Sequence, residues 1–267
     1  MGRLDGKTAI VTGASRGLGA VIAQVFAEEG AAVVVAARTL EEGTARHPGS
    51  VETVSRRIQE SGGRTLAVGC DVSNEHDRIE LVERSLQAFG AVDILVNNAA
   101  AFGNAPFLAL PLRRFERCFD VNVFAAYHLM QLVLPGMVER RSGWIVNVTS
   151  DASRRPPPGP YAGSPQMGGN AYGVSKLALE HLTRGAASEF HVHNVAVNAL
   201  MPSMPVPTPS MLDAVPHLEE YVTAESFAEA AVRLASCDPS VTNGLALYSE
   251  DVLHPELGTR GWLAGSL

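Results

Sequence analysis

The chain has 267 residues, a net charge of −7 and 46% hydrophobic residues, which is enough for one sizeable α/β core. It has no long basic run, and this argues against nucleic acid as a partner, because phosphate binding needs clustered lysine and arginine. The three cysteines show neither a CxxC pair nor a zinc spacing, so we expect no disulfide and no bound metal. The N-terminus lacks a secretory pattern, and the apolar runs are too short to cross a bilayer. We therefore expect a cytoplasmic protein that does not bind membranes.

Short apolar runs alternate with amphipathic stretches from the start of the chain. The expected strands are Thr8–Val11, Ala32–Ala36, Thr65–Val68, Ile94–Val96, Trp144–Val148, Val192–Ala199 and Leu245–Tyr248. The expected helices are Leu18–Glu29, Ser50–Glu60, Glu75–Phe89, Leu112–Val133, Tyr172–Phe190 and Ser226–Leu234. Gly30 and Pro135 stand where the first and fourth helices are expected to stop.

Continuous apolar strands that are each followed by a helix predict a parallel sheet covered on both faces. The fold class is therefore α/β, a doubly wound (Rossmann) sheet of about seven strands in one domain spanning residues 1–267. Two connections, Leu40–Gly49 and Ser153–Gly169, are longer than usual and are candidate functional loops. We expect the substrate loops at about residues 151–170 and 202–225.

The stretch TGASRGLG places Gly13, Gly17 and Gly19 between the first expected strand and helix. Glycine lets the backbone approach a pyrophosphate closely, and a helix N-terminus offers free N–H groups and partial positive charge. A tight turn without a ligand is the alternative. The position after the first strand of an alternating α/β chain favours dinucleotide binding.

Other motifs follow this turn in a definite order. They are CDVSN (70–74), NNAA (97–100), FDVNVFAAY (119–127), GWIVNVTSDAS (143–153), AYGVSK (171–176) and VAVNALMPS (195–203). Together with GxxxGxG after a threonine, they resemble the single-domain branch of the short-chain dehydrogenase/reductase family. The resemblance extends from about residue 6 to residue 248.

The resemblance implies a nicotinamide dinucleotide, a carbonyl or secondary alcohol substrate, and two sets of site residues. The implied catalytic residues are Asn122, Ser150, Tyr172 and Lys176. The implied cofactor-binding residues are Gly13, Ser15, Arg16, Gly17, Leu18, Gly19, Arg38, Thr39, Asp71, Val72, Asn98, Ala99, Ala100, Tyr172, Lys176, Pro202 and Ser203. In family terms, Asn122 anchors a water in a proton relay, Ser150 holds the substrate oxygen and Lys176 grips the nicotinamide ribose.

Tyr172 and Lys176 lie four positions apart, and on a helix both side chains would leave the same face. A tyrosine has an ordinary pKa of about 10, too high for a base at neutral pH, and a nearby positive charge favours the phenolate. Tyr172 would then protonate a carbonyl oxygen during reduction, or deprotonate an alcohol during oxidation. A surface pair without a role is the alternative. Tyr161 is a rival phenol, but Pro165 stands four residues after it.

The cofactor preference depends on the residue after the second strand. NAD-dependent enzymes usually have an acid about 20 residues after the glycine turn, whereas Arg38 stands in that region. Arg16 and Arg38 would suit a 2′-phosphate by charge and by forked geometry, so NADP(H) is favoured over NAD(H). In the alternative, Arg16 faces solvent and Arg38 pairs with Glu41 or Glu42.

The sequence departs from the family pattern at several positions. Ala100 replaces the glycine of NNAG, Ser203 replaces a glycine after Pro202, and Thr208 is a weak candidate for contacting the nicotinamide amide. The longer loop after Ser150 suggests that Tyr161 and Met167 line the substrate pocket. The apolar loops favour a hydrophobic or cyclic ketone.

Two other functions remain open on the sequence alone. One is a dinucleotide-binding sensor or scaffold without chemistry, and the other is a dehydratase or epimerase on the same fold. The family resemblance also implies a homodimer or homotetramer formed through the long helices around Leu112–Val133 and Tyr172–Phe190.

Overall fold

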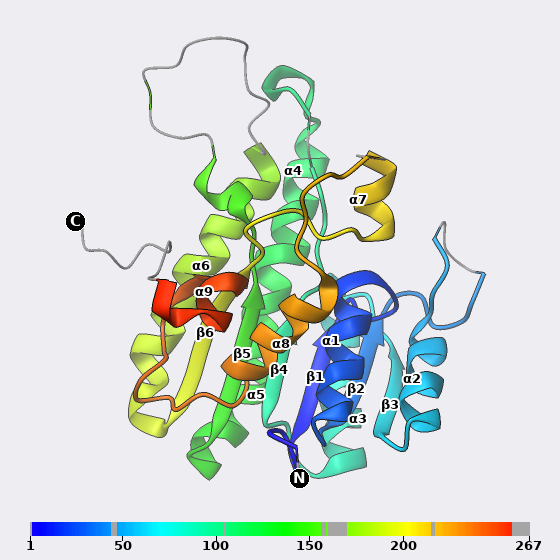
Figure 1. The fold of residues 1–267 in the computed structure, drawn as a ribbon, viewed down its shortest axis with the longest axis vertical. Helices are drawn as coiled ribbons and strands as arrows, with labels where there is room; N and C mark the ends of the chain where they lie inside the picture. Colours follow the sequence, from blue (N-terminus) through cyan, green and yellow to red (C-terminus); the bar gives the residue numbers. More distant parts are fainter. Residues whose placement is uncertain are drawn as a thin grey trace.

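A computed structural model of the chain describes residues 2–43, 47–103, 105–155, 159, 170–214 and 217–257. Its centre is a parallel sheet in the order β3-β2-β1-β4-β5-β6-β7 (Figure 1). The strands are β1 (Thr8–Thr12), β2 (Ala32–Ala37), β3 (Arg64–Gly69), β4 (Ile94–Asn97), β5 (Gly143–Val148), β6 (Val195–Met201) and β7 (Ala246–Tyr248). This confirms the predicted fold class.

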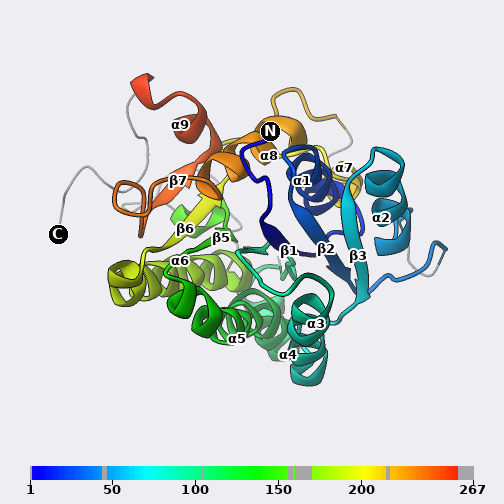
Figure 2. The same cartoon turned by 90° about the horizontal axis from the view of Figure 1, so that it is seen from below.

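Helices cover both faces of the sheet (Figure 2). The α-helices are α1 (Gly17–Glu28), α2 (Val51–Glu60), α3 (Glu75–Phe89), α4 (Leu112–Phe119), α5 (Ala125–Arg140), α6 (Asn170–Phe190), α7 (Pro209–Ala214), α8 (Ala224–Leu234) and α9 (Ser249–Leu253). Helices α1, α2 and α8 pack on one face, and α3, α5 and α6 pack on the other. Short helical turns are η1 (Phe107–Ala109), η2 (Asp120–Phe124), η3 (Asp151–Arg154), η4 (His191–His193) and η5 (Pro255–Leu257).

The apolar runs of the strands supply both halves of the core. Along β1, Val11 belongs to the cluster under α1, whereas its neighbour Ile10 belongs to the cluster under α3 and α5. Successive strand side chains point to opposite faces, so a strand that is buried on both faces has to be apolar at every position. The continuous runs in the sequence have this cause.

The long helix expected at 112–133 differs from the prediction in two ways. A π-helical turn, η2, separates α4 from α5, and Pro135 lies inside α5, which ends only at Arg140. Leu134 and Met137 on either side of this proline are buried against the sheet. Packing of this apolar face outweighs the hydrogen bond that a proline removes from a helix.

The sixth strand begins at Val195 rather than Val192. His191–His193 form the turn η4, and Asn194 has a φ of 59°, a left-handed conformation that ends this turn before the strand. The other predicted boundaries lie within one or two residues of the observed elements. The sequence analysis did not identify α7, α9 or the helical turns.

Within the described residues, one helical stretch, Leu112–Arg140, is long and apolar enough to cross a membrane by length and composition. Of its most apolar 18-residue window, 56% is buried inside the fold. Its apolar character therefore fits a helix that packs on the sheet.

The strand order places the functional residues. β1 lies between β2 and β4, so the chain winds outward in opposite directions from β1. In open α/β sheets, ligands bind outside the carboxyl ends of the strands at such a switch point. The ends of β1 and β4 are the positions of the glycine turn and of NNAA.

Candidate active site

The glycine turn follows β1 in a conformation that only small residues permit. Gly13 has a φ of 66°, and a Cβ there would lie 2.8 Å from the Cα of Ala99. A Cβ on Gly19 would lie 2.4 Å from Asn98 Nδ2 and 2.6 Å from the carbonyl oxygen of Gly13. These two glycines therefore let the turn and the first coil of α1 pack directly on the end of β4.

Asn98 and Thr12 lock this contact from the other side. Asn98 Nδ2 donates to the carbonyl oxygens of Thr12 (2.7 Å) and Gly13 (3.3 Å). The backbone N–H groups of Asn98 and Ala99 donate to Thr12 Oγ1 at 3.0 and 3.1 Å. Asn98 thus holds the glycine turn in place. Ala99 and the exposed Ala100 follow it in the loop after β4.

The start of α1 suits an anionic group. Its N-cap residue, Arg16, makes no side-chain cap hydrogen bond, and the first turn of α1 contains no acidic residue. Ser15 is buried beside it, and Leu18 packs on the core under α1. Uncapped N–H groups at a helix N-terminus bind phosphate through hydrogen bonds and the helix dipole. The residues present therefore fit the pyrophosphate of a dinucleotide.

Arg16 and Arg38 lie differently at the end of β2. Arg16 Nη2 donates to Thr39 Oγ1 (3.0 Å) and to the carbonyl oxygen of Gly49 (2.8 Å), while Arg16 Nε is buried without a partner among the described residues. Arg38 is exposed. Arg16 therefore bridges the glycine turn to the connection before α2, and Arg38 is open to solvent next to it.

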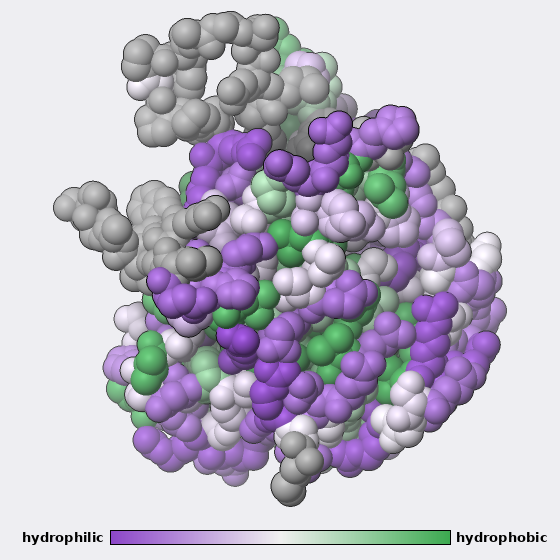
Figure 3. Space-filling model, in the orientation of Figure 1, coloured by the Kyte–Doolittle hydropathy of each residue, from purple (hydrophilic) through white to green (hydrophobic). Residues whose placement is uncertain are grey.

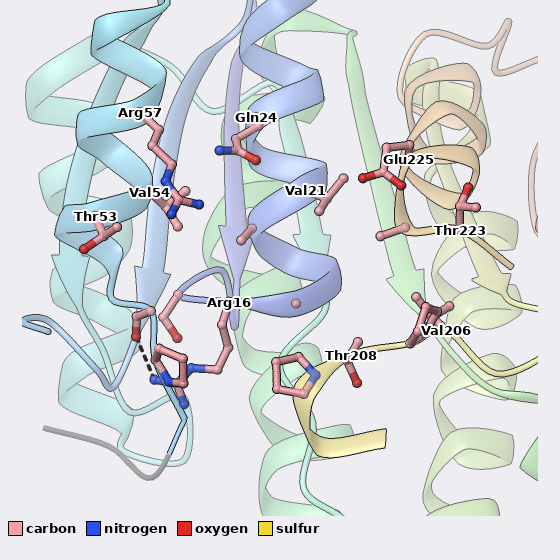
Figure 4. Close-up of a pocket in the computed structure, with 18 of the residues that line it drawn as sticks. Arg16, Val21, Gln24, Thr53, Val54, Arg57, Val206, Thr208, Thr223 and Glu225 are labelled. Carbon is pink, nitrogen blue, oxygen red and sulfur yellow. Dashed lines mark hydrogen bonds between the residues drawn. The ribbon is translucent and has the colours of Figure 1, made fainter. Parts of the chain in front are cut away.

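A cavity of about 700 Å³ runs along the outer side of α1, between α2 and α8 (Figure 4). Its lining includes Arg16, Gln24 and Arg57, and on the far side Thr208 and Glu225. It adjoins the glycine turn but is not lined by any of the four predicted catalytic residues. This cavity is therefore distinct from the place where the catalytic residues meet.

Asp71 and Val72 follow β3, as predicted. Val72 is buried, and the Asp71 carboxylate accepts hydrogen bonds from the backbone N–H and hydroxyl of Ser73. Burial would raise the pKa of Asp71, but the Ser73 hydrogen bonds and the charges of Arg117 and Arg38 outweigh it and lower the pKa. Arg117 of α4 lies 3.4 Å from this carboxylate and also donates to the Ser73 hydroxyl. The sequence analysis missed Arg117, because no motif links α4 to the end of β3.

Ser150, Tyr172 and Lys176 come together although the first two are 22 positions apart in the sequence. Ser150 follows β5, and its side chain lies close enough to that of the half-buried Tyr172 to lower the pKa of the tyrosine. Lys176 is 1% exposed; its Nζ donates to the carbonyl oxygen of Val148 at 2.7 Å and lies 5.6 Å from the centroid of the Tyr172 ring. The fold thus brings the predicted serine, tyrosine and lysine to one place at the end of β5.

The pKa values differ from the sequence-based expectation. Burial raises the pKa of Tyr172 to about 12, opposed by the Ser150 hydrogen bond. Burial also lowers the pKa of Lys176 to about 8, opposed by the negative charges of Cys118, when ionised, and Glu180. Lys176 therefore does not by itself bring Tyr172 toward ionisation in this arrangement, because its ammonium is turned to the Val148 carbonyl.

Asn122 lies in the π-helical turn η2 and is buried. Its Oδ1 accepts from the backbone N–H of Ala101 (2.8 Å), and its Nδ2 donates to the Ala101 carbonyl (3.0 Å) and to Ser175 Oγ (2.9 Å). Ser175 Oγ in turn donates to the backbone carbonyl of Tyr172 at 2.7 Å. Asn122 therefore connects the loop after β4 with the N-terminal part of α6.

Pro202 and Ser203 are half-buried and directly follow β6. They therefore lie at the carboxyl ends of the strands, as the other site residues do. Further along this loop, the Thr208 methyl group lies 3.2 Å from the position that a Cβ on Gly17 would take. Thr208 therefore sits against the glycine turn, as Figure 4 also shows. Tyr161 and Met167, which we expected to line the substrate pocket, lie outside the described residues.

Known proteins resemble this chain in sequence. A family model described as short chain dehydrogenase matches residues 7–216. The chain belongs to the short-chain dehydrogenase family. The 7α-hydroxysteroid dehydrogenase of Escherichia coli (strain K12) is 38% identical to this short-chain dehydrogenase over 200 residues, 75% of this chain and 71% of the relative. The sorbitol dehydrogenase of Cereibacter sphaeroides is 34% identical over 203 residues, 76% of this chain and 72% of the relative.

A solved structure supports the same assignment. A 7α-hydroxysteroid dehydrogenase in complex with NADH and 7-oxo glycochenodeoxycholic acid superposes on this short-chain dehydrogenase with a TM-score of 0.75 and 32% identity, covering 92% of this chain and 93% of that one. Members of the family transfer a hydride between a nicotinamide dinucleotide and a small substrate. This chain is therefore an oxidoreductase with a dinucleotide-binding fold.

Proposed function

We propose that this short-chain dehydrogenase interconverts a ketone and a secondary alcohol, with Tyr172 as general acid and base. The observation that carries the proposal is the proximity of the Tyr172 and Ser150 side chains, which come from different elements and meet at the end of β5. A bound nicotinamide dinucleotide supplies the hydride acceptor or donor. Tyr172 gives its phenolic proton to the carbonyl oxygen during reduction and takes the alcohol proton during oxidation.

Ser150 and Lys176 would assist this proton transfer in different ways. The Ser150 hydroxyl orients the substrate oxygen and, through its hydrogen bond, favours the Tyr172 phenolate. Lys176 adds positive charge one helical turn away and, as the family resemblance implies, would bind the ribose hydroxyls. Burial raises the pKa of Tyr172. The positive charge of an oxidised nicotinamide would lower this pKa and so oppose the effect of burial.

Asn122 is proposed to fix the position of the loop after β4 relative to the N-terminal part of α6. Its hydrogen bonds to Ala101 and Ser175 support that role. A water anchored there would complete a proton path from Tyr172, as the family resemblance implies.

We infer that NADP(H) is preferred to NAD(H). Arg16 stands at the N-terminus of α1, and Arg38 follows β2 with an exposed guanidinium. No acidic side chain replaces Arg38 at the position that would bond a ribose 2′-hydroxyl. A 2′-phosphate would take its place between two cations, and Thr39, already bonded to Arg16, would lie beside it. The solved relative is in complex with NADH, so NADH is the comparison nucleotide for testing this preference.

The proposed substrates are hydrophobic or cyclic ketones. Phe102, next to Tyr172, and the proline-rich loop after β6 support an apolar pocket. Two relatives carry steroid names and one is a sorbitol dehydrogenase, so a steroid ketone and a polyol are informative probes. We propose one domain, a cytoplasmic location and no membrane or nucleic-acid partner.

Assembly into a homodimer or homotetramer is proposed through the helices on the α5 side. Leu112, Phe124, Tyr127, Val174 and Leu177 of this side are large apolar residues that remain exposed. The opposite face, formed by α1 and α8, carries mainly hydrophilic side chains with scattered apolar ones (Figure 3). Light scattering that shows only a 28.3 kDa species would contradict this proposal.

The decisive experiment compares wild type with Tyr172→Phe in the oxidation of NADPH. The probes are 7-oxo glycochenodeoxycholic acid and cyclohexanone, with sorbitol and NADP⁺ for the reverse direction. Tyr127→Phe, the same change at an exposed position of α5, serves as the control. We expect Tyr172→Phe to lose the turnover while binding NADPH normally. Equally slow NADPH oxidation by wild type and Tyr172→Phe would favour a sensor. A product formed without net oxidation or reduction would favour a dehydratase or epimerase.

A further inference from the structure

A buried ion pair lies directly behind the proposed catalytic residues. Arg154 Nη1 donates to both oxygens of Glu180 at 2.9 Å. Arg154 belongs to η3, the turn that Ser150 opens, whereas Glu180 belongs to α6, one turn after Lys176. The Arg154 side chain is 15% exposed and that of Glu180 is 5% exposed. This pair therefore connects the element that carries Ser150 with the helix that carries Tyr172.

Ser153 completes the connection. Its hydroxyl lies 2.7 Å from the backbone carbonyl oxygen of Ser150 and 2.7 Å from Glu180 Oε1, and it accepts a hydrogen bond from Arg154 Nη1 at 2.6 Å. The single proton of Ser153 serves one of the two oxygens at a time, so the hydroxyl links both. Ser150 is thereby held through its own main-chain carbonyl oxygen, four covalent bonds from its side-chain hydroxyl oxygen.

The network continues to the edge of the sheet. Tyr248 at the end of β7 donates through its hydroxyl to Asp151 Oδ1 at 2.7 Å, and Asp151 Oδ2 accepts from Arg155 Nε at 2.6 Å. Both ends of the short turn η3 are therefore fixed, one to α6 and one to β7. Arg155 directly follows η3, and its side chain is 69% exposed.

Stability alone does not account for the Arg154–Glu180 pair. Taking two charges out of water costs more than their attraction returns unless every donor and acceptor is satisfied. Arg154 Nε and Nη2 are buried without a hydrogen-bond partner among the described residues. A pair of apolar side chains would fill this place at no greater cost. What apolar side chains cannot supply is the directed hydrogen bond to Ser153.

We propose that Arg154 and Glu180 are positioning residues that, through Ser153, hold Ser150 at hydrogen-bonding distance from Tyr172. The proposal rests on the ketone reduction proposed above. Neither residue touches the substrate oxygen. They act on the distance between the hydroxyl groups of Ser150 and Tyr172, which are proposed to contact that oxygen. A misplacement of about 1 Å at a reacting centre costs roughly 100-fold in rate.

The first test replaces the whole pair by apolar side chains, as Arg154→Met together with Glu180→Leu. No buried charge is left unpaired, so the double variant is expected to fold and to bind NADPH as wild type does. The kcat for the probe ketone that wild type reduces best should fall roughly 10- to 100-fold, with the KM for NADPH unchanged. The exposed ion pair of α3, changed in the same way as Arg84→Met together with Glu80→Leu, is the matched control and should retain the wild-type kcat. A folded double variant with the kcat of wild type would overturn the proposal.

Ser153 provides a second test that keeps both charged partners of the ion pair. Ser153→Ala removes the linking hydroxyl and should lower kcat without changing the KM for NADPH, whereas Ser153→Thr keeps a hydroxyl and should restore kcat. Equal kcat values in the alanine and threonine variants would overturn the proposal even if the double variant fails to fold.

A crystal structure of Ser153→Ala separates this inference from the proposed function. The distance between Ser150 Oγ and Tyr172 Oη is expected to be longer than in a wild-type crystal. An unchanged distance contradicts the positioning role. If wild type reduces none of the probe ketones, the proposed function fails, but this distance still decides the inference.

Discussion

The ring of Phe102 stacks on the ring of Tyr172, with their centroids 4.6 Å apart and their planes inclined by 27°. Phe102 lies in the loop after β4 and is 61% exposed, so it covers the tyrosine from the solvent side. Asn122 fixes the backbone of the preceding residue, Ala101. Part of the burial that raises the pKa of Tyr172 therefore comes from a loop that is held by another predicted site residue.

Phe102→Ala is expected to expose Tyr172 to water. Since burial is the main reason for its raised pKa, the pKa should fall and the rise of kcat with pH in alcohol oxidation should begin at lower pH. Loss of the stacked pair should also reduce the free energy of unfolding by about 0.5–1.5 kcal/mol. The pH profile of kcat measures the first effect and urea unfolding measures the second. Phe107→Ala, at an exposed phenylalanine of η1, should leave the pH profile in place.

Ser150→Ala should move the same profile in the opposite direction. The Ser150 hydrogen bond lowers the pKa of Tyr172, so its loss raises that pKa, and alcohol oxidation then requires higher pH. Removing one donor to the reacting oxygen should in addition reduce kcat roughly 100- to 1,000-fold. A profile that keeps its wild-type position while kcat falls would show that Ser150 acts on the substrate alone.

Lys176→Met should change how stability depends on pH. The folded-state pKa of Lys176 is about 8, against 10.5 for an ordinary lysine. Between these values the unfolded chain binds a proton that the folded chain does not, so the wild type gains stability as pH rises through this window. At about 1.4 kcal/mol per pH unit, the gain relative to Lys176→Met is roughly 3 kcal/mol.

Urea unfolding of wild type and Lys176→Met at pH 7.5 and at pH 10 measures this difference. The contributions of titratable groups that both proteins share cancel when the two free energies of unfolding are subtracted. A difference in unfolding free energy that does not change between the two pH values would mean that Lys176 is not buried in solution.

Arg38→Asp should weaken the binding of NADPH far more than that of NADH. A charge-assisted hydrogen bond to phosphate contributes about 1.5–3 kcal/mol, which corresponds to roughly 10- to 100-fold in Kd. Fluorescence titration of both nucleotides measures it. Arg56→Asp, the same charge change on an exposed position of α2, is the control. Equal effects of Arg38→Asp on the two nucleotides would mean that Arg38 does not contact a 2′-phosphate.

Much of this protein could be read from its sequence because the determining signals are local. Apolar strands followed by helices at regular spacing predicted a parallel sheet, and the glycine pattern after the first strand marked where a dinucleotide would bind. Each signal reflects a constraint within a few residues, such as a positive φ at Gly13 or the shared helix face of Tyr172 and Lys176. The family motifs are recognisable for the same reason.

Other features depend on contacts between residues far apart in the chain, and only the tertiary structure decided them. Pro135 remains inside α5 because the sheet buries the residues around it. The ammonium of Lys176 is bonded to the carbonyl of Val148, and burial raises the pKa of Tyr172 where the sequence suggested that a neighbouring charge would lower it. Arg154 and Glu180 carry no signal in the sequence, since 26 positions separate them. Propensity and spacing act along the chain, whereas burial and ion pairing depend on what the fold brings together.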